Sequence, residues 1–131
     1  HKLVFTTDRD GTPQLYQADV LGGGVKRLTW EGSYNSGADF SPNGRYLTYV
    51  HRDEKGRYRI ALHDLHSKRV RLITEGPLDE SPSFSPNGDM IIYASKYMNR
   101  MMLNSIARNG QGVEPILIDA DYRQPAWAPF N

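Results

Sequence analysis

Short apolar segments recur along the whole chain, separated by polar stretches rich in Gly, Pro, Asn and Asp. Residues 47–50, 59–63 and 91–94 are typical, with Ile, Leu, Tyr and Ala prominent among them. Short runs of this composition are typical of β-strands, and several alternate apolar with polar positions, as a strand with one buried face does. Since no segment of a dozen residues carries a helical period, the pattern predicts an all-β fold.

The string Phe-Ser-Pro-Asn-Gly occurs at residues 40–44 and again at 84–88, 44 residues further on, with a weaker echo at 127–131. The apolar segments follow the same spacing, four to a repeat. Four short strands in roughly 40–45 residues is the size of one propeller blade. The sequence therefore predicts a partial β-propeller domain over residues 1–131, with four-stranded blades and about three repeats. We place these repeats at 3–44, 45–88 and 89–131.

Turn chemistry separates the predicted strands. Residues 8–11 and 53–56 each end in a Gly that accepts a positive φ, as a hairpin loop requires. Ser-Pro-Asn-Gly reads as a tight turn between the last strand of one repeat and the first strand of the next. The predicted strands are 3–6, 14–18, 25–29, 38–41, 47–50, 59–63, 70–74, 82–85, 91–94, 102–106, 115–118 and 125–128.

Three blades do not make a closed ring, because closed propellers usually have about 4–8 blades. The chain also opens on the second strand of one blade and ends on the first strand of another. We expect either that this is a piece of a longer chain or that two copies pair as a homodimer. In the homodimer, the strand around 125–128 pairs with residues 3–6 of the second copy and gives six blades.

Composition narrows the function classes. The 16 Lys and Arg against 15 Asp and Glu give a net charge of +1, so there is no general attraction to nucleic acid. No apolar run approaches the roughly 20 residues of a membrane-spanning helix, so we expect no membrane insertion. The chain has no cysteine, which excludes disulfides and thiol catalysis.

The histidines give the strongest hint of metal or catalytic chemistry, since His63 and His66 flank Asp64. His63 and Asp64 fall on opposite faces of a strand, however, and no third ligand is near in sequence. We interpret these side chains as exposed polar groups entering a turn. The chain also lacks Gly-x-Ser-x-Gly and Ser-x-x-Lys. We expect no catalytic residue, metal or cofactor.

Four stretches in order resemble one family: Leu-Val-Phe-Thr-Thr-Asp from residue 3, Arg-Leu-Thr-Trp-Glu-Gly-Ser from 27, Leu-Asp-Glu-Ser-Pro-Ser from 78 and Pro-Ala-Trp-Ala-Pro-Phe from 125. The chain resembles the last three blades of the C-terminal β-propeller of the TolB family, over essentially its whole length. The resemblance implies half of a six-bladed propeller in a non-catalytic periplasmic scaffold of the Tol–Pal system. It implies as partners the peptidoglycan-associated lipoprotein Pal, other Tol proteins and colicins. It also implies a role in outer-membrane integrity and cell division.

Loops entering the innermost strand of each blade converge around one mouth of a propeller, and binding residues concentrate on such loops. By the resemblance, this is the face that binds Pal. An alternative for Asp79 and Glu80 is that they only accept hydrogen bonds from turn amides. A second candidate function is the propeller of a serine peptidase of the prolyl-oligopeptidase type, gating a hydrolase domain. The candidate protein-binding residues are Tyr34, Asn35, Leu78, Asp79, Glu80, Ser81, Tyr122 and Arg123.

Overall fold

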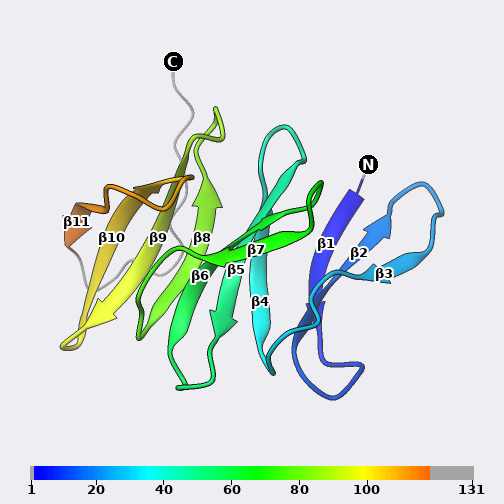
Figure 1. The fold of residues 1–131 in the computed structure, drawn as a ribbon, viewed down its shortest axis with the longest axis horizontal. Coiled ribbons are helices and arrows are strands. Elements are labelled where there is room, and N and C mark those ends of the chain that lie inside the picture. Colours follow the sequence, from blue (N-terminus) through cyan, green and yellow to red (C-terminus); the bar gives the residue numbers. More distant parts are fainter. Residues whose placement is uncertain (1, 119–131) are drawn as a thin grey trace.

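The computed structural model describes residues 2–118, which form three antiparallel sheets and no helix (Figure 1). None of the described residues forms a helix long and apolar enough to cross a bilayer. The all-β prediction is confirmed. The strands are β1 (Lys2–Thr7), β2 (Gln14–Asp19) and β3 (Val25–Arg27) in the first sheet; β4 (Asn35–Phe40), β5 (Tyr46–Arg52), β6 (Tyr58–Asp64) and β7 (Arg69–Leu72) in the second; and β8 (Asp79–Phe84), β9 (Met90–Tyr97), β10 (Arg100–Ala107) and β11 (Glu114–Ile118) in the third.

Each sheet is ordered as its strands follow in sequence, and β4 and β8 each occupy one edge of a four-stranded sheet. These two strands come from the ends of the predicted repeats, so each four-stranded sheet begins with the strand that closes the preceding repeat. The hairpins between β5 and β6 and between β9 and β10 lie at the lower end of the sheets in Figure 1. The strand predicted at 125–128 lies outside the described residues.

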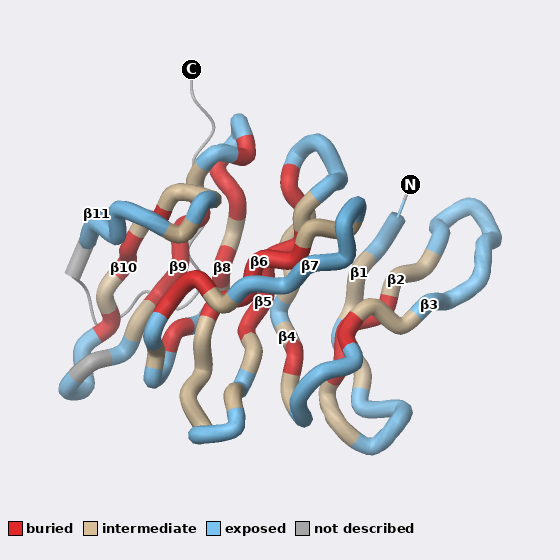
Figure 2. Tube along the Cα trace, viewed as in Figure 1, coloured by how far each residue is buried: buried red, intermediate tan, exposed pale blue. Residues whose placement is uncertain are grey.

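The second sheet is apolar on both faces. Its central strands contain consecutive apolar residues, and neighbouring residues of a strand point to opposite sides of the sheet. Leu47 and Tyr49 of β5 pack with Leu15 of the first sheet, and all three are nearly inaccessible. Val50 of β5 and Ile60 of β6 face the other way, into a cluster shared with the third sheet. Figure 2 shows this burial concentrated on the central strands. Three sheets are thereby held by two apolar interfaces.

The repeated Ser-Pro-Asn-Gly forms the same turn twice. In the first copy, Gly44 N–H donates to the Ser41 carbonyl at 2.9 Å, and the Asn43 side-chain oxygen accepts from the Ser41 hydroxyl at 2.7 Å. The Ser41 hydroxyl in turn accepts from Tyr46 N–H at 2.9 Å, at the start of β5. The equivalent bonds recur at 2.9, 2.7 and 3.0 Å in the second copy, where Ser85 replaces Ser41. The string is therefore a self-satisfied turn that starts the next strand.

The outer strand of two sheets ends earlier than the sequence predicts, because a threonine side chain replaces the backbone ladder. The Thr29 hydroxyl accepts from Leu15 N–H at 2.9 Å, although β3 has already ended at Arg27. The Thr74 hydroxyl accepts from Ile60 N–H at 2.8 Å in the same way. This side-chain bond turns the chain away from the sheet and toward the next innermost strand.

Candidate functional site

A pocket of about 530 Å³ lies between the second and third sheets, at the end where β4 and β8 begin. It brings together four of the residues predicted from the sequence: Tyr34, Leu78, Asp79 and Glu80. The hairpins β5–β6 and β9–β10 add further lining residues, which the sequence did not single out: Tyr58, Lys96, Asn99 and Met101. The predicted residues therefore share one surface with the tips of two hairpins.

Tyr58 joins the two segments that enter the inner strands. Its ring meets that of Tyr34 edge to face, with the centroids 5.3 Å apart. Its backbone N–H donates to the Pro77 carbonyl at 2.7 Å, and it forms a parallel bridge with Leu78. Edge-to-face aromatic pairs are a favoured geometry and restrict both rings. Tyr34 and Leu78, which is 45% exposed, are therefore held next to each other by one residue of β6.

Asn35 is the first residue of β4 rather than part of a loop, and it is 1% exposed. Its side-chain amide donates to the Gln14 side-chain oxygen at 2.9 Å and to the Glu31 carbonyl at 2.8 Å. Because both bonds fix the amide orientation, its oxygen faces His51 Nδ1 at 2.7 Å as the acceptor. Asn35 therefore positions the loop before β4 and presents no side-chain surface to a partner.

Asp79 occupies the equivalent first position of β8 and is 4% exposed. Its carboxylate accepts from Gly76 N–H at 2.8 Å. Burial raises the pKa of Asp79, against the lowering effect of hydrogen bonds from Thr74 and Gly76. The alternative interpretation of Asp79 as a turn-capping group thus agrees with its contacts. Glu80, the next residue, is exposed and presents its side chain at the surface.

Ser81 lies at an irregularity in β8, where the register with β9 shifts between Glu80 and Ser83. Its φ is +54°, which is uncommon for a residue other than glycine. Gly37 has a φ of +70° at the equivalent bulge of β4. Bulges of this kind bend a strand and change the direction of its side chains. Both inner strands are therefore bent just beyond the pocket.

Two of the predicted site residues, Tyr122 and Arg123, lie outside the described residues. The position of two hairpins in the predicted strand order could have identified some of the pocket residues that were not predicted. In an antiparallel sheet, the hairpin after the second strand lies at the same end as the start of the first strand. Tyr58, just after the 53–56 turn, and Lys96, near the end of β9, could have been assigned to the site on that basis.

The interpretation of His63 as an exposed turn residue is wrong. His63 is 7% exposed because its face of β6 packs toward the first sheet, and its ring meets that of Tyr49 at 6.1 Å. His66 is exposed, as expected. Within residues 2–118, no group of three or more His, Asp or Glu side chains is placed to hold a metal ion.

A profile of the family described as the TolB beta propeller domain matches residues 1–131. This chain belongs to the TolB β-propeller family. The sheets described above are consistent with that family's architecture, since four-stranded antiparallel sheets packed face to face are propeller blades. The predicted family and the predicted fold class are both confirmed.

Two relatives show how much of a TolB protein this chain matches. The Tol-Pal system protein TolB of Nitrosospira multiformis is 41% identical over 120 residues, covering 88% of this chain and 27% of that protein. The crystal structure of TolB from Acinetobacter baumannii has a TM-score of 0.79 at 38% identity, covering 91% of this chain and 31% of that chain. This chain therefore spans about a third or less of the length of these two relatives.

A propeller attached to a peptidase is also similar in shape. The β-propeller domain of the Trilobed protease from Pyrococcus furiosus has a TM-score of 0.64 at 12% identity, covering 88% of this chain and 38% of that chain. At that identity the likeness shows the fold alone. It gives no support to a shared activity.

Proposed function

We propose that this chain is a non-catalytic protein-binding part of a Tol–Pal system protein in the periplasm, and that the surface around the β4–β8 pocket binds Pal. The chain would then contribute to outer-membrane integrity and cell division, and colicins would compete for the same surface. The observation that carries the proposal is the convergence of Tyr34, Leu78 and Glu80 on one pocket of a TolB-family propeller.

The chemistry of this surface suits a protein partner. Tyr34 and Tyr58 present an aromatic pair, and Leu78 adds exposed apolar area beside them. Large side chains that are fixed before binding lose little entropy on association, and aromatic residues dominate many interface hot spots. Glu80 and Lys96 border this apolar area with opposite charges. Such a border favours one orientation of a charged partner over others.

Calorimetric titration of soluble Pal into the chain tests the proposal. We expect Leu78→Ala to weaken binding about tenfold, because it removes the exposed apolar contact. Glu80→Lys reverses a surface charge, and we expect it to weaken binding by a similar factor. Glu114→Lys is the matched control, since Glu114 is exposed on β11 and does not line the pocket. Equal affinities for all three variants and the unmodified chain would exclude this surface as the Pal site.

Completion of a six-bladed ring by two copies stays a prediction from the repeat. Light scattering on the purified chain measures it directly. A dimer mass at micromolar concentration supports pairing of two copies, and a monomer mass contradicts it.

A further inference from the structure

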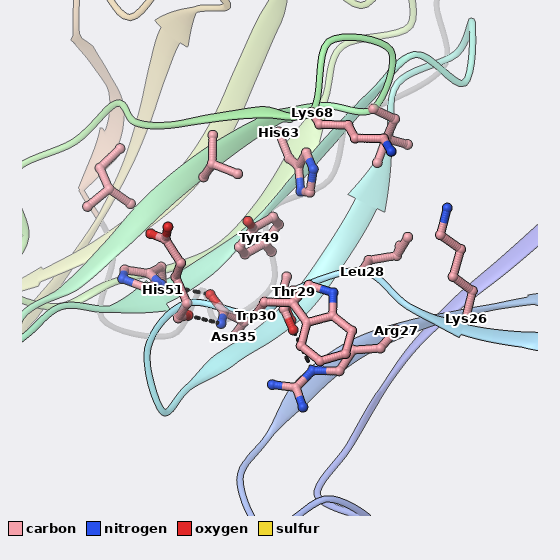
Figure 3. A pocket seen from close by; sticks show the side chains of 14 residues that line it. Lys26, Arg27, Leu28, Thr29, Trp30, Asn35, Tyr49, His51, His63 and Lys68 are labelled. Atoms are coloured by element: carbon pink, nitrogen blue, oxygen red, sulfur yellow. Dashed lines mark hydrogen bonds between the residues drawn. The ribbon is translucent and has the colours of Figure 1, made fainter.

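A second pocket, of about 570 Å³, lies between the first and second sheets, on the other face of the second sheet from the β4–β8 pocket. Figure 3 shows side chains from both sheets around it, with Arg27 of β3 and the following Trp30 on one side and Tyr49 and His63 of the second sheet on the other. Beside the pocket β3 is only three residues long, and the Thr29 hydroxyl accepts from Leu15 N–H just beyond its end. The pocket shares no lining residue with the β4–β8 pocket, and of the site residues predicted from the sequence only the buried Asn35 contributes to its wall.

His63 marks this pocket as unusual for a blade interface. Its Nδ1 is buried and has no hydrogen-bond partner. Buried polar groups in proteins are nearly always paired, because each unpaired one costs stability. Burial also lowers the pKa of His63, which favours the neutral ring. In Figure 3 the ring points from β6 into the space between the two sheets, and His63 lines the pocket there.

The repeat provides an internal comparison for this position. His63 pairs opposite Leu47, whereas Ile106 pairs opposite Ile91, the residue 44 positions after Leu47. Ile106 is 0% exposed and packs in the apolar cluster between the second and third sheets. The same position in two blade interfaces is thus filled by isoleucine in one and left as an unpaired histidine beside a cavity in the other. The fold itself does not require a polar group there.

The opposite side of the pocket presents a fixed aromatic surface. Trp30 is 71% exposed, and the Arg27 guanidinium lies 4.2 Å from its ring centroid. Arg27 is itself held, because its Nε donates to the Thr29 carbonyl at 2.6 Å. A cation over an indole ring restrains the ring and leaves its other parts available for stacking. An exposed tryptophan restrained in this way suits a planar apolar group.

The charged residues of the lining favour an anion. Lys26, Arg27 and Lys68 line the pocket, and Glu31 is the only carboxylate among the lining residues described. Neither lysine forms an ion pair with any residue in 2–118. We propose that this pocket binds a small organic anion with a planar apolar body, of the aromatic carboxylate class. The planar body stacks near Trp30, the carboxylate lies toward Lys68 or Lys26, and the His63 ring completes the polar contacts.

Calorimetric titration with 2-naphthoate and its neutral isostere 2-naphthamide tests the proposal on the 131-residue chain. We expect naphthoate to bind with a dissociation constant below about 1 mM, and naphthamide about tenfold more weakly because it lacks the charge. Trp30→Ala should weaken both ligands about tenfold. Lys68→Gln should weaken naphthoate and leave naphthamide unchanged, since only the anion uses that charge.

Two further variants separate the site from general charge and from folding effects. Arg71→Gln removes an exposed cation that does not line the pocket, and it should leave naphthoate binding unchanged. His63→Ile fills the position as Ile106 does and should weaken naphthoate at least about fivefold. Thermal melts establish that each variant is folded. The proposal is overturned if naphthoate and naphthamide bind equally, if naphthoate fails to bind at millimolar concentration, or if Trp30→Ala and Lys68→Gln leave its affinity unchanged.

Discussion

The carboxylate of Asp39 accepts a hydrogen bond of 2.9 Å from the backbone N–H of Phe84. Asp39 lies on β4 and Phe84 on β8, so a side chain of one inner strand completes the backbone hydrogen bonding of the next. Phe84 is 6% exposed and belongs to the apolar cluster between the two sheets. The bond therefore couples the geometry of neighbouring blades at the point where their inner strands approach each other.

Replacing Asp39 with alanine should destabilise the chain. The variant leaves the Phe84 N–H without its partner, and an unsatisfied buried donor costs about 1–3 kcal/mol. Urea unfolding followed by circular dichroism measures the change in the free energy of unfolding. Asp8→Ala is the control, because Asp8 is an exposed residue in a hairpin turn. An unfolding midpoint for Asp39→Ala equal to that of the control would mean that the bond contributes nothing.

Asp39 should also give the stability a recognisable pH dependence. Burial raises its pKa above the usual range of an aspartate, so the folded state binds the proton more tightly than the unfolded state. Its contribution is fully present below the ordinary aspartate pKa of about 3.9 and is lost as the pH rises through the raised pKa of the folded state. We expect the stability of the unmodified chain relative to Asp39→Asn to fall over that window. A difference that stays constant, or grows, from pH 3 to pH 6 would contradict the assignment.

The two Ser-Pro-Asn-Gly turns should respond alike to the loss of their serine hydroxyls. Ser41 and Ser85 each accept a bond from the first residue of the following strand and donate one to the turn asparagine. Removing both bonds should cost about 1–2 kcal/mol for Ser41→Ala and a similar amount for Ser85→Ala. Gly88 of the second turn lies against Pro42 of the first, but each serine bonds only within its own turn, so the double variant should lose close to the sum of the two. Chemical unfolding of the four proteins checks both the equality and the additivity.

The sequence predicts the turns and most strands well because their chemistry is local. Ser-Pro-Asn-Gly satisfies its own hydrogen bonds, and the strands between turns have the expected composition. The starts of β4 and β8 were placed too late, since Asn35 and Asp79 are residue types that strands disfavour. They enter the ladder through pairing with His51 and Ser95, which lie on the neighbouring strand and are set by tertiary structure.

The same reasoning explains what sequence analysis could not give for the two pockets. Strand alternation places His63 on the face of Ala61, but only the packed structure shows that the first sheet covers that face. Trp30 reads as part of a family motif, and nothing local predicts that Arg27 restrains its ring. Pockets between blades depend on strand length and on which residues meet across an interface. Both are properties of long-range packing.

In the β9–β10 hairpin, Met98 has a left-handed backbone conformation that is unfavourable for methionine. Tyr97 pairs with Arg100, so Met98 and Asn99 form a two-residue loop, and both have positive φ, at 49° and 62°. Loops of this kind favour asparagine or glycine, because a larger side chain costs about 1–2 kcal/mol in the left-handed region. Met98→Asn should therefore stabilise the chain by about 1 kcal/mol, since Met98 is 79% exposed and loses little packing. Met98→Val is the opposite control and should destabilise it, and thermal melts that rank the two variants the other way would refute the loop geometry.

His63→Ile should raise the stability of the chain even though it is expected to weaken anion binding. The substitution eliminates an unpartnered buried Nδ1, a change worth about 1–3 kcal/mol, and places an apolar side chain beside Tyr49. Ile106 shows that the equivalent position accepts isoleucine with full burial. The free energy of unfolding from urea denaturation measures the gain. His66→Ile provides the comparison. Because His66 is exposed in the turn after β6, this variant should change the free energy of unfolding by less than about 0.5 kcal/mol. A loss of stability in His63→Ile would mean that the histidine ring makes contacts that isoleucine cannot replace.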